Sequence, residues 1–126
     1  MNFKSISYFL GLSCFPISFL AFINILYSSY FDYFLSIDTY FTTLLFSFLI
    51  GISLLYYGKD SLKKISFIEK LFLIITTYFL AASLISIPFY SSNNQITFIN
   101  SFFESISGLT GTGFSIFKNI KYLDPT

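Results

Sequence analysis

Long runs without a charged residue divide the chain into three apolar segments. The runs extend over residues 5–31, 39–58 and 71–90. A helix needs roughly 20 apolar residues to cross about 30 Å of hydrocarbon, so each run is long enough to span a membrane. Backbone groups in lipid must be satisfied within the segment, which predicts helices even though Phe, Ile and Tyr favour strands in water. The first run is too long for the apolar core of a cleaved signal peptide, so we expect it to be a membrane helix.

The positions of lysine predict the orientation of these helices. The loop between the first two runs carries Asp32 and Asp38 but no Lys. Five lysines lie before the first run or between the second and third: Lys4, Lys59, Lys63, Lys64 and Lys70. The positive-inside rule therefore places the N-terminus and the 59–70 loop in the cytoplasm, in a multi-pass protein of the cell (inner or plasma) membrane. The third helix then runs outward, ends near Pro88 and is followed by an external turn at residues 91–95.

Tyrosines lie at both predicted membrane interfaces. Tyr27, Tyr30 and Tyr33 follow the first run on the outer side, and Tyr56 and Tyr57 end the second run on the inner side. Tyrosine is enriched at the level of the lipid headgroups, so this placement agrees with the predicted orientation.

The composition excludes several classes of function. Only 10% of the 126 residues are charged, against about a quarter in soluble domains, which leaves too few charges for a solvated surface. The formal net charge is +1 and no basic stripe is present, so nucleic-acid binding has no electrostatic basis. The chain has no His and one Cys, Cys14, which lies in an apolar run and is expected to be a small buried residue. Because a metal or Cys–His catalytic site has no residues to be built from, we expect neither an enzyme nor a bound cofactor.

Residues 96–117 are apolar but do not have the pattern of a fourth membrane helix. Gly108, Gly111 and Gly113 lie in the segment, and each costs about 1 kcal/mol of helix stability relative to Ala. Glu104 would cost roughly 2.5–3.5 kcal/mol at the centre of a bilayer. A continuous spanning helix is therefore disfavoured.

A short helix that enters the membrane halfway explains both features. Ser101 and Glu104 fit the S-x-x-E capping box, and a helix from there to Gly108 would reach about 12–15 Å, close to the midplane from outside. The three glycines would then allow the chain to leave the helix and turn. The segment from Thr110 to Gly113 would follow in extended form and offer carbonyl and hydroxyl oxygens, as selectivity filters do. A small-residue packing face or an extracellular loop is the alternative.

Residues 102–115, FFESISGLTGTGFS, resemble the first pore-loop signature of the TrkH/KtrB potassium-transporter superfamily. That signature reads close to F-F-E-[AS]-x-S-G-[LF]-T-T-T-G-[AF]-[ST]. The upstream layout is similar too, with a short N-terminus, two helices, a Lys-rich inner loop and a helix ending in a Pro-Phe pair, here Pro88 and Phe89. The resemblance covers essentially the whole chain and implies potassium transport without covalent chemistry.

The resemblance also implies roles for single residues. Thr110, Gly111, Thr112 and Gly113 would form one quarter of a potassium selectivity filter and bind the ion through backbone oxygens. Gly113 matches the glycine found in each family repeat, whereas Gly111 replaces the usual Thr, which removes a hydroxyl and adds flexibility. Glu104 matches an acidic position near the external mouth, where capping of the pore helix is the expected role and attraction of cations the alternative.

Family members contain four helix–pore loop–helix repeats, form homodimers and are gated by a cytosolic nucleotide-binding ring. Potassium, the lipid bilayer, the further repeats, a second copy and the gating ring are therefore the expected partners. We expect two parts, namely residues 1–66 with two helices and the Lys-rich loop, and residues 67–126 with the first helix, pore helix and filter loop of an incomplete repeat. Such a chain would be a fragment, a split gene product or a truncated reading frame that does not conduct alone.

The predicted fold class is an all-α membrane protein. It would have three transmembrane helices, a re-entrant pore helix and a selectivity-filter loop, the first quarter of a four-repeat cation-channel-like fold. The alternative function is that of a small three-helix membrane protein for interaction or assembly, without transport, in which residues 96–117 serve as a packing segment.

Overall fold

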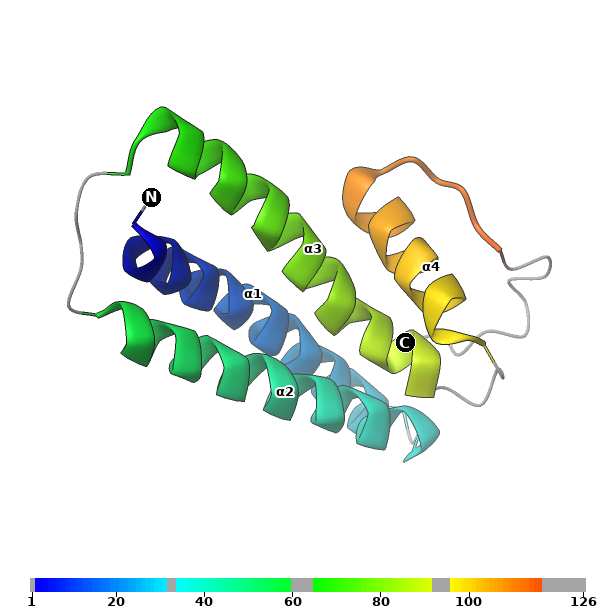
Figure 1. The fold of residues 1–126 in the computed structure, drawn as a ribbon. Coiled ribbons are helices and arrows are strands. Elements are labelled where there is room, and N and C mark those ends of the chain that lie inside the picture. The colour runs from blue at the N-terminus through cyan, green and yellow to red at the C-terminus, as the bar shows by residue number, and fades with distance from the viewer. Residues whose placement is uncertain (1, 32–33, 60–64, 92–95, 117–126) are drawn as a thin grey trace.

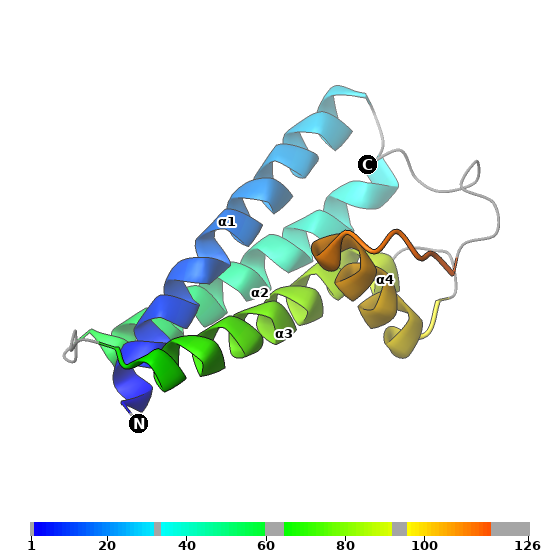
Figure 2. The same cartoon turned by 90° about the horizontal axis from the view of Figure 1, so that it is seen from above.

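The computed structural model describes residues 2–31, 34–59, 65–91 and 96–116, and their regular structure is entirely helical. Four helices follow one another along the chain: α1 (Phe3–Tyr30), α2 (Phe34–Gly58), α3 (Phe67–Ser91) and α4 (Phe98–Thr110). Figure 1 shows α1, α2 and α3 as long helices that pack together, with the shorter α4 beside α3. In Figure 1 α4 lies on the opposite side of α3 from α1 and α2, and Figure 2 shows it beside the C-terminal half of α3.

Three of the helices are long and apolar enough to cross a membrane, namely α1, α3 and the part of α2 from Ile37 to Gly58. The prediction of an all-helical chain with three helices of membrane-spanning length is therefore confirmed for the described residues, and these helices are compatible with a membrane-integral protein. Two prolines lie inside helices: α1 continues through Pro16, and α3 continues through Pro88 to Ser91, slightly beyond the predicted end. The predicted external turn falls largely on residues 92–95, and Tyr33 lies between α1 and α2; both are outside the described residues.

The most extensive helix packing joins α1 to α2, and glycines allow their backbones to come close. A Cβ atom added at Gly11 would lie 2.8 Å from the carbonyl oxygen of Gly51 and from the amide nitrogen of Leu55. A Cβ atom at Gly58 would lie 2.5 Å from the carbonyl oxygen of Lys4. Small residues at helix interfaces are the usual device for close packing in membranes, where lipid gives no hydrophobic drive for helices to associate.

Small polar residues continue this α1–α2 seam, the interface built from the small residues of both helices. Ser18 and Ser47 are buried and their hydroxyl oxygens lie 2.7 Å apart, which joins the two helices by a hydrogen bond. Cys14 is fully buried in the same seam, with its Cβ 3.1 Å from where a Cβ of Gly51 would be. The expectation that Cys14 is a small buried residue is confirmed.

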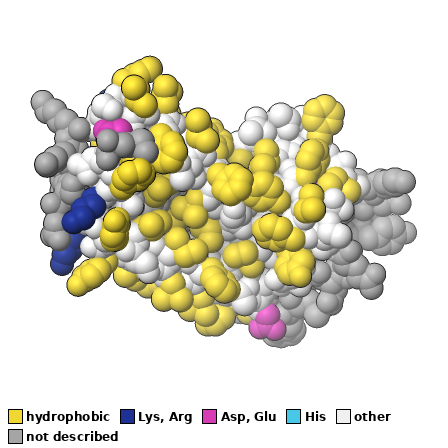
Figure 3. Space-filling model, in the orientation of Figure 1, with side chains coloured by type: hydrophobic (Ala, Val, Ile, Leu, Met, Phe, Trp, Pro, Cys, Tyr) yellow, Lys and Arg dark blue, Asp and Glu magenta, His cyan; other side chains and the backbone are white. Residues whose placement is uncertain are grey.

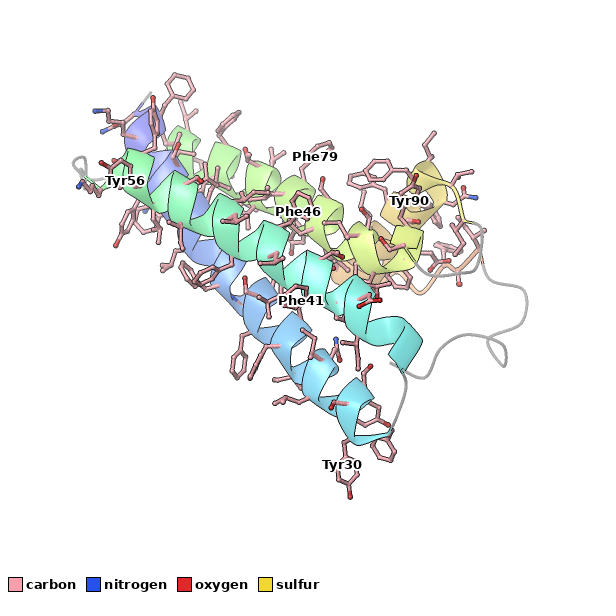
Figure 4. The ribbon with its side chains drawn as sticks, turned by 90° about the horizontal axis from the view of Figure 1, so that it is seen from below. Tyr30, Phe41, Phe46, Tyr56, Phe79 and Tyr90 are labelled. Carbon is pink, nitrogen blue, oxygen red and sulfur yellow. The ribbon has the colours of Figure 1, made fainter. Side chains whose placement is uncertain are left out.

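The outer surface of the helices is apolar. Most large hydrophobic side chains are exposed, including Phe19, Ile75 and Phe79 at more than 60% each. Figure 3 shows hydrophobic side chains spread over much of the face between the grey regions, while the lysines drawn lie at one end of the molecule. In Figure 4, Tyr30 and Tyr56 mark opposite ends of the α1–α2 pair. This surface suits lipid rather than water, in agreement with the three membrane-length helices.

Polar contacts fasten the helix ends that lie near the lysines. Ser66 and Glu69 form a capping box at the start of α3, because the Ser66 amide donates to Glu69 Oε2 at 2.8 Å and the Glu69 amide donates to Ser66 Oγ at 3.4 Å. The Asn2 amide donates to Glu69 Oε1 at 2.5 Å and ties the start of α1 to α3. At the end of α2, the Lys59 Nζ lies 4.7 Å from the centre of the Tyr56 ring.

Candidate functional site

Helix α4 begins earlier than the sequence pattern predicted. The N-cap is Thr97, whose hydroxyl accepts a hydrogen bond from the Asn100 amide at 3.4 Å. Ser101 is inside the helix, where its hydroxyl donates to the Thr97 carbonyl at 3.1 Å. The capping box predicted at Ser101 and Glu104 is therefore wrong, since Thr97 takes the capping position one turn earlier. The helix has 13 residues, or about 20 Å, which is too short to cross about 30 Å of hydrocarbon.

Among the described helices, α4 packs against α3 alone, and aromatic rings join the two. The Phe98 ring lies 6.1 Å from that of Tyr90, near the end of α3, and the Phe102 ring lies 5.3 Å from that of Phe79. Phe79 is midway between the ends of α3. An apolar groove farther along α4 is lined by Ile75, Tyr78, Phe79, Ile106, Leu109 and Thr110. The helices are thus antiparallel, and α4 ends beside the middle of α3.

Three serines form the buried side of α4. Ser101, Ser105 and Ser107 are at most 5% exposed. The Ser105 hydroxyl donates to the Ser101 carbonyl at 2.9 Å, so the helix itself satisfies it. Ser101 and Ser105 are one turn apart and share a helix face, which is the spacing of small residues that pack helices closely in membranes.

A Schellman motif ends α4. Gly111 has left-handed backbone angles, with φ of 66° and ψ of 19°. Its amide donates to the Gly108 carbonyl at 3.2 Å and the Thr112 amide donates to the Ser107 carbonyl at 3.2 Å, which is the hydrogen-bond pair of this motif. The helix therefore ends at Thr110, two residues later than predicted. Thr110 is helical rather than extended, and Gly108 is an ordinary helix residue.

The expectation that glycines take unusual angles is confirmed at two positions, Gly111 and Gly113, where φ is 66° and 72°. Left-handed angles cost a residue with a Cβ roughly 1–2 kcal/mol. At Gly111, where the TrkH/KtrB signature has Thr, the motif that ends α4 gives glycine a local physical role. Glycine at position 111 is therefore explained by the left-handed backbone of the turn, without reference to the flexibility of the loop.

Hydroxyl groups hold the chain after the turn against the end of α4. The Ser107 hydroxyl donates to the Phe114 carbonyl at 2.5 Å and lies 3.1 Å from the Thr112 hydroxyl. The Thr110 hydroxyl donates to the Ile106 carbonyl at 2.8 Å. A Schellman motif usually has an apolar contact between the residues that Ser107 and Thr112 occupy. A hydroxyl pair replaces it here, so the turn is polar.

Glu104 holds the next part of the chain. Its Oε1 accepts a hydrogen bond from the Ser115 hydroxyl at 2.8 Å and another from the Ile116 amide. The chain therefore reverses after Gly111 and returns along α4, as the orange segment in Figure 1 shows. We call residues 112–116 the returning segment. Neither Ser107 nor Ser115 was predicted as a site residue, because their partners lie too far along the chain for a local pattern to reveal them.

The backbone carbonyl oxygens at the turn and those that flank it differ in their hydrogen bonding. No described residue donates a hydrogen bond to the carbonyls of Thr110, Gly111, Thr112 or Gly113, whereas the Ser107, Gly108 and Phe114 carbonyls each accept at least one. These four residues are exposed. They also follow the C-terminus of a helix, which carries partial negative charge. The turn thus combines neutral oxygens that accept no hydrogen bond from the described residues with a field that favours a cation.

Among the described residues, no group of three or more His, Cys, Asp or Glu side chains lies together as metal ligands do. The oxygens at the turn come from backbone and hydroxyl groups, which suit weakly held, hard cations.

Residues 102–115 resemble the TrkH/KtrB signature, and membership of that superfamily stays a prediction that rests on these residues alone. The structure adds a short helix, a glycine turn and a returning segment in the same stretch. Comparison with models of known families, with curated proteins and with solved structures finds no match to this chain.

Proposed function

We propose that the chain contributes one pore loop to a membrane pathway for monovalent cations, with potassium as the ion. In this proposal α4 is the re-entrant pore helix and Thr110, Gly111, Thr112 and Gly113 are the filter residues. The ion moves passively, and the chain performs no covalent chemistry. One loop supplies only part of a ring of oxygens, so the pathway requires further loops around the same axis.

The observation that carries the proposal is the set of free carbonyl groups at the glycine turn. Four successive residues keep their carbonyl oxygens without a hydrogen bond from any described residue, although the hydroxyls of Ser107, Thr110 and Thr112 are all hydrogen-bonded. Backbone oxygens at membrane depth are tolerated where they line a cavity or a path for ions. Potassium filters use such oxygens in place of the hydration shell of the ion.

The position of α4 along α3 supports the proposed depth. The start of α4 lies beside Tyr90, near the end of α3, and its last residues lie beside Ile75 and Phe79. If α3 crosses the membrane, the distance along it from Tyr90 to Phe79 is about 16 Å, roughly half the hydrocarbon thickness. The glycine turn would then lie near the midplane.

The test is potassium uptake in a host that lacks its own uptake systems. The chain is expressed together with the coding sequence that surrounds it in its genome, and growth at low potassium and ⁸⁶Rb⁺ uptake are recorded. We expect Gly113→Ser to reduce uptake about tenfold, since a Cβ at φ of 72° strains the turn by roughly 1–2 kcal/mol and shifts the carbonyls.

Gly108→Ser is the matched control. It makes the same chemical change five residues earlier, within α4, where Gly108 has ordinary helical angles and open space around its Cβ position. We expect this variant to keep its uptake and its level in the membrane. Equal uptake by Gly113→Ser and the unaltered protein, at equal membrane levels, would refute the assignment of Gly113 to a filter.

The small-residue packing of α4 favours the alternative function, a membrane interaction or assembly module. Ser101 and Ser105 are buried on one face of the helix, as in packing segments that do not form a pore. The same pair of variants separates the two functions. A packing module shows no uptake in any form. Gly113→Ser would strain only the turn after α4 and, with nothing within 4 Å of the added Cβ, would leave the packing of α4 on α3 in place.

A further inference from the structure

Glu104 makes contacts that neither of its expected roles explains. As a cap, its carboxylate would lie at the start of α4, yet the helix begins six residues earlier at Phe98. As a group that attracts cations at a mouth, it would leave its oxygens free for the ion. Instead, Oε1 accepts two hydrogen bonds from the returning segment, from the Ser115 hydroxyl and the Ile116 amide.

Glu104 and Ser107 act on the same stretch of chain from the same helix face. They are three residues apart, so their side chains lie one above the other on α4. Ser107 holds Thr112 and Phe114, and Glu104 holds Ser115 and Ile116. The earlier helix residue, Glu104, holds the later part of the segment. This order is expected for a segment that runs back along the helix. Together they hold both ends of the returning segment, which carries two of the four carbonyls at the turn, those of Thr112 and Gly113.

We infer that Glu104 is a positioning residue, which sets the path of the returning segment and thereby the direction of the Thr110–Gly113 carbonyls. This inference rests on the proposed function, since it assigns to Glu104 the control of ion preference at the same filter. Glu104 acts through its hydrogen bonds to the chain, not through contact with the ion. A shift in carbonyl direction changes how well the ring replaces the hydration shell of potassium relative to the smaller sodium ion.

The first experiment is amide hydrogen exchange of the whole chain in lipid nanodiscs, with no ion flux required. We expect Glu104→Ala to speed exchange of the Ile116 amide by about tenfold or more, because a hydrogen bond to a charged acceptor is lost. Glu104→Gln keeps an oxygen at the Oε1 position and should stay within about threefold of the unaltered chain. Asn100→Ala is the control, since Asn100 lies one turn earlier and its side chain makes no hydrogen bond among the described residues.

The second experiment compares potassium and sodium uptake in the host assay described above. A variant that merely misfolds lowers both uptakes equally, whereas a lost positioning contact lowers the potassium-to-sodium ratio. We expect Glu104→Ala to reduce this ratio at least threefold and Glu104→Gln to keep the ratio of the unaltered protein. If both variants lower the ratio equally, the charge of the carboxylate matters rather than its hydrogen bonds. If neither lowers it, Glu104 does not control the ratio, and either result overturns the positioning role.

The two measurements separate this inference from the proposed function. Unchanged exchange at Ile116 in Glu104→Ala overturns the inference even if the protein transports potassium. Faster exchange without uptake by any form of the protein, the unaltered one included, refutes the filter and the control of selectivity. In that case only the hydrogen-bond role of Glu104 in the chain reversal stands.

Discussion

Replacement of the seam glycines by alanine tests the packing of α1 against α2. At Gly11 the added Cβ would lie 2.8 Å from two backbone atoms of α2, the Gly51 oxygen and the Leu55 nitrogen. Ordinary contacts begin at 3.4 Å, so the helices must separate locally by 3.4 − 2.8 = 0.6 Å. Backbone atoms of a helix cannot move aside singly, and the strain therefore falls on the whole seam.

The three seam glycines give a ranked series. The same subtraction gives 3.4 − 2.5 = 0.9 Å at Gly58 and 3.4 − 3.1 = 0.3 Å at Gly51, where the nearest atom is the Cys14 Cβ. Overpacking costs about 1–3 kcal/mol, and alanine regains up to about 1 kcal/mol of helix propensity relative to glycine. We expect a net cost of about 2 kcal/mol for Gly58→Ala, about 1 kcal/mol for Gly11→Ala and close to zero for Gly51→Ala.

Cys14 provides the assay. It is the one cysteine of the chain and is fully buried in the seam, so a maleimide reagent labels it only when α1 and α2 part. In detergent with increasing dodecyl sulfate, each 1.4 kcal/mol of destabilisation should raise the labelling rate about tenfold. Gly108→Ala is the control, because it adds a Cβ in open space on α4. A labelling rate for Gly58→Ala no higher than for Gly51→Ala would refute the close approach of the two helices.

Three further predictions concern single hydrogen bonds and one turn. Thr97→Ala removes the N-cap of α4 and should destabilise that helix by about 1 kcal/mol, measured as faster amide exchange in its first turn only. A double-mutant cycle of Ser18→Ala and Ser47→Ala, read by Cys14 labelling, should give a coupling of about 0.6 kcal/mol, the average for such bonds in membranes; a coupling of zero would contradict the bond. Gly111→Ala should cost roughly 1–2 kcal/mol at the end of α4, whereas Gly111→Asn, which tolerates left-handed angles better, should cost less. Equal effects of these two variants would argue against the left-handed turn.

The spacing of charges predicted the three long helices well, because the length of an uncharged run decides by itself whether the run can cross lipid, without knowledge of tertiary contacts. The ends were less predictable. The third apolar run starts after Lys70, yet α3 begins at Phe67 with Glu69 and Lys70 in its first turns. Charged residues at a helix end reach the polar layer or a capping partner, as Glu69 does with Ser66. They therefore mark the end of the apolar run rather than the end of the helix.

The capping residue of α4 shows the limit of a local motif. S-x-x-E occurs at Ser66–Glu69 and again at Ser101–Glu104, but only the first pair forms a capping box. The second pair lies inside a helix that Thr97 already caps, so its carboxylate is free to bind elsewhere. Its partners, Ser115 and Ile116, are more than ten residues away, and no periodic pattern encodes such a contact.

The α1–α2 seam has a consequence for biosynthesis. Its close contacts join two helices that are neighbours in the chain, and none of them requires α3 or α4. Contacts between neighbouring segments form early, because little chain must be ordered to bring them together. The hairpin of α1 and α2 can therefore assemble in the bilayer while the rest of the polypeptide is still on the ribosome. It then offers a finished template against which α3 docks as it emerges.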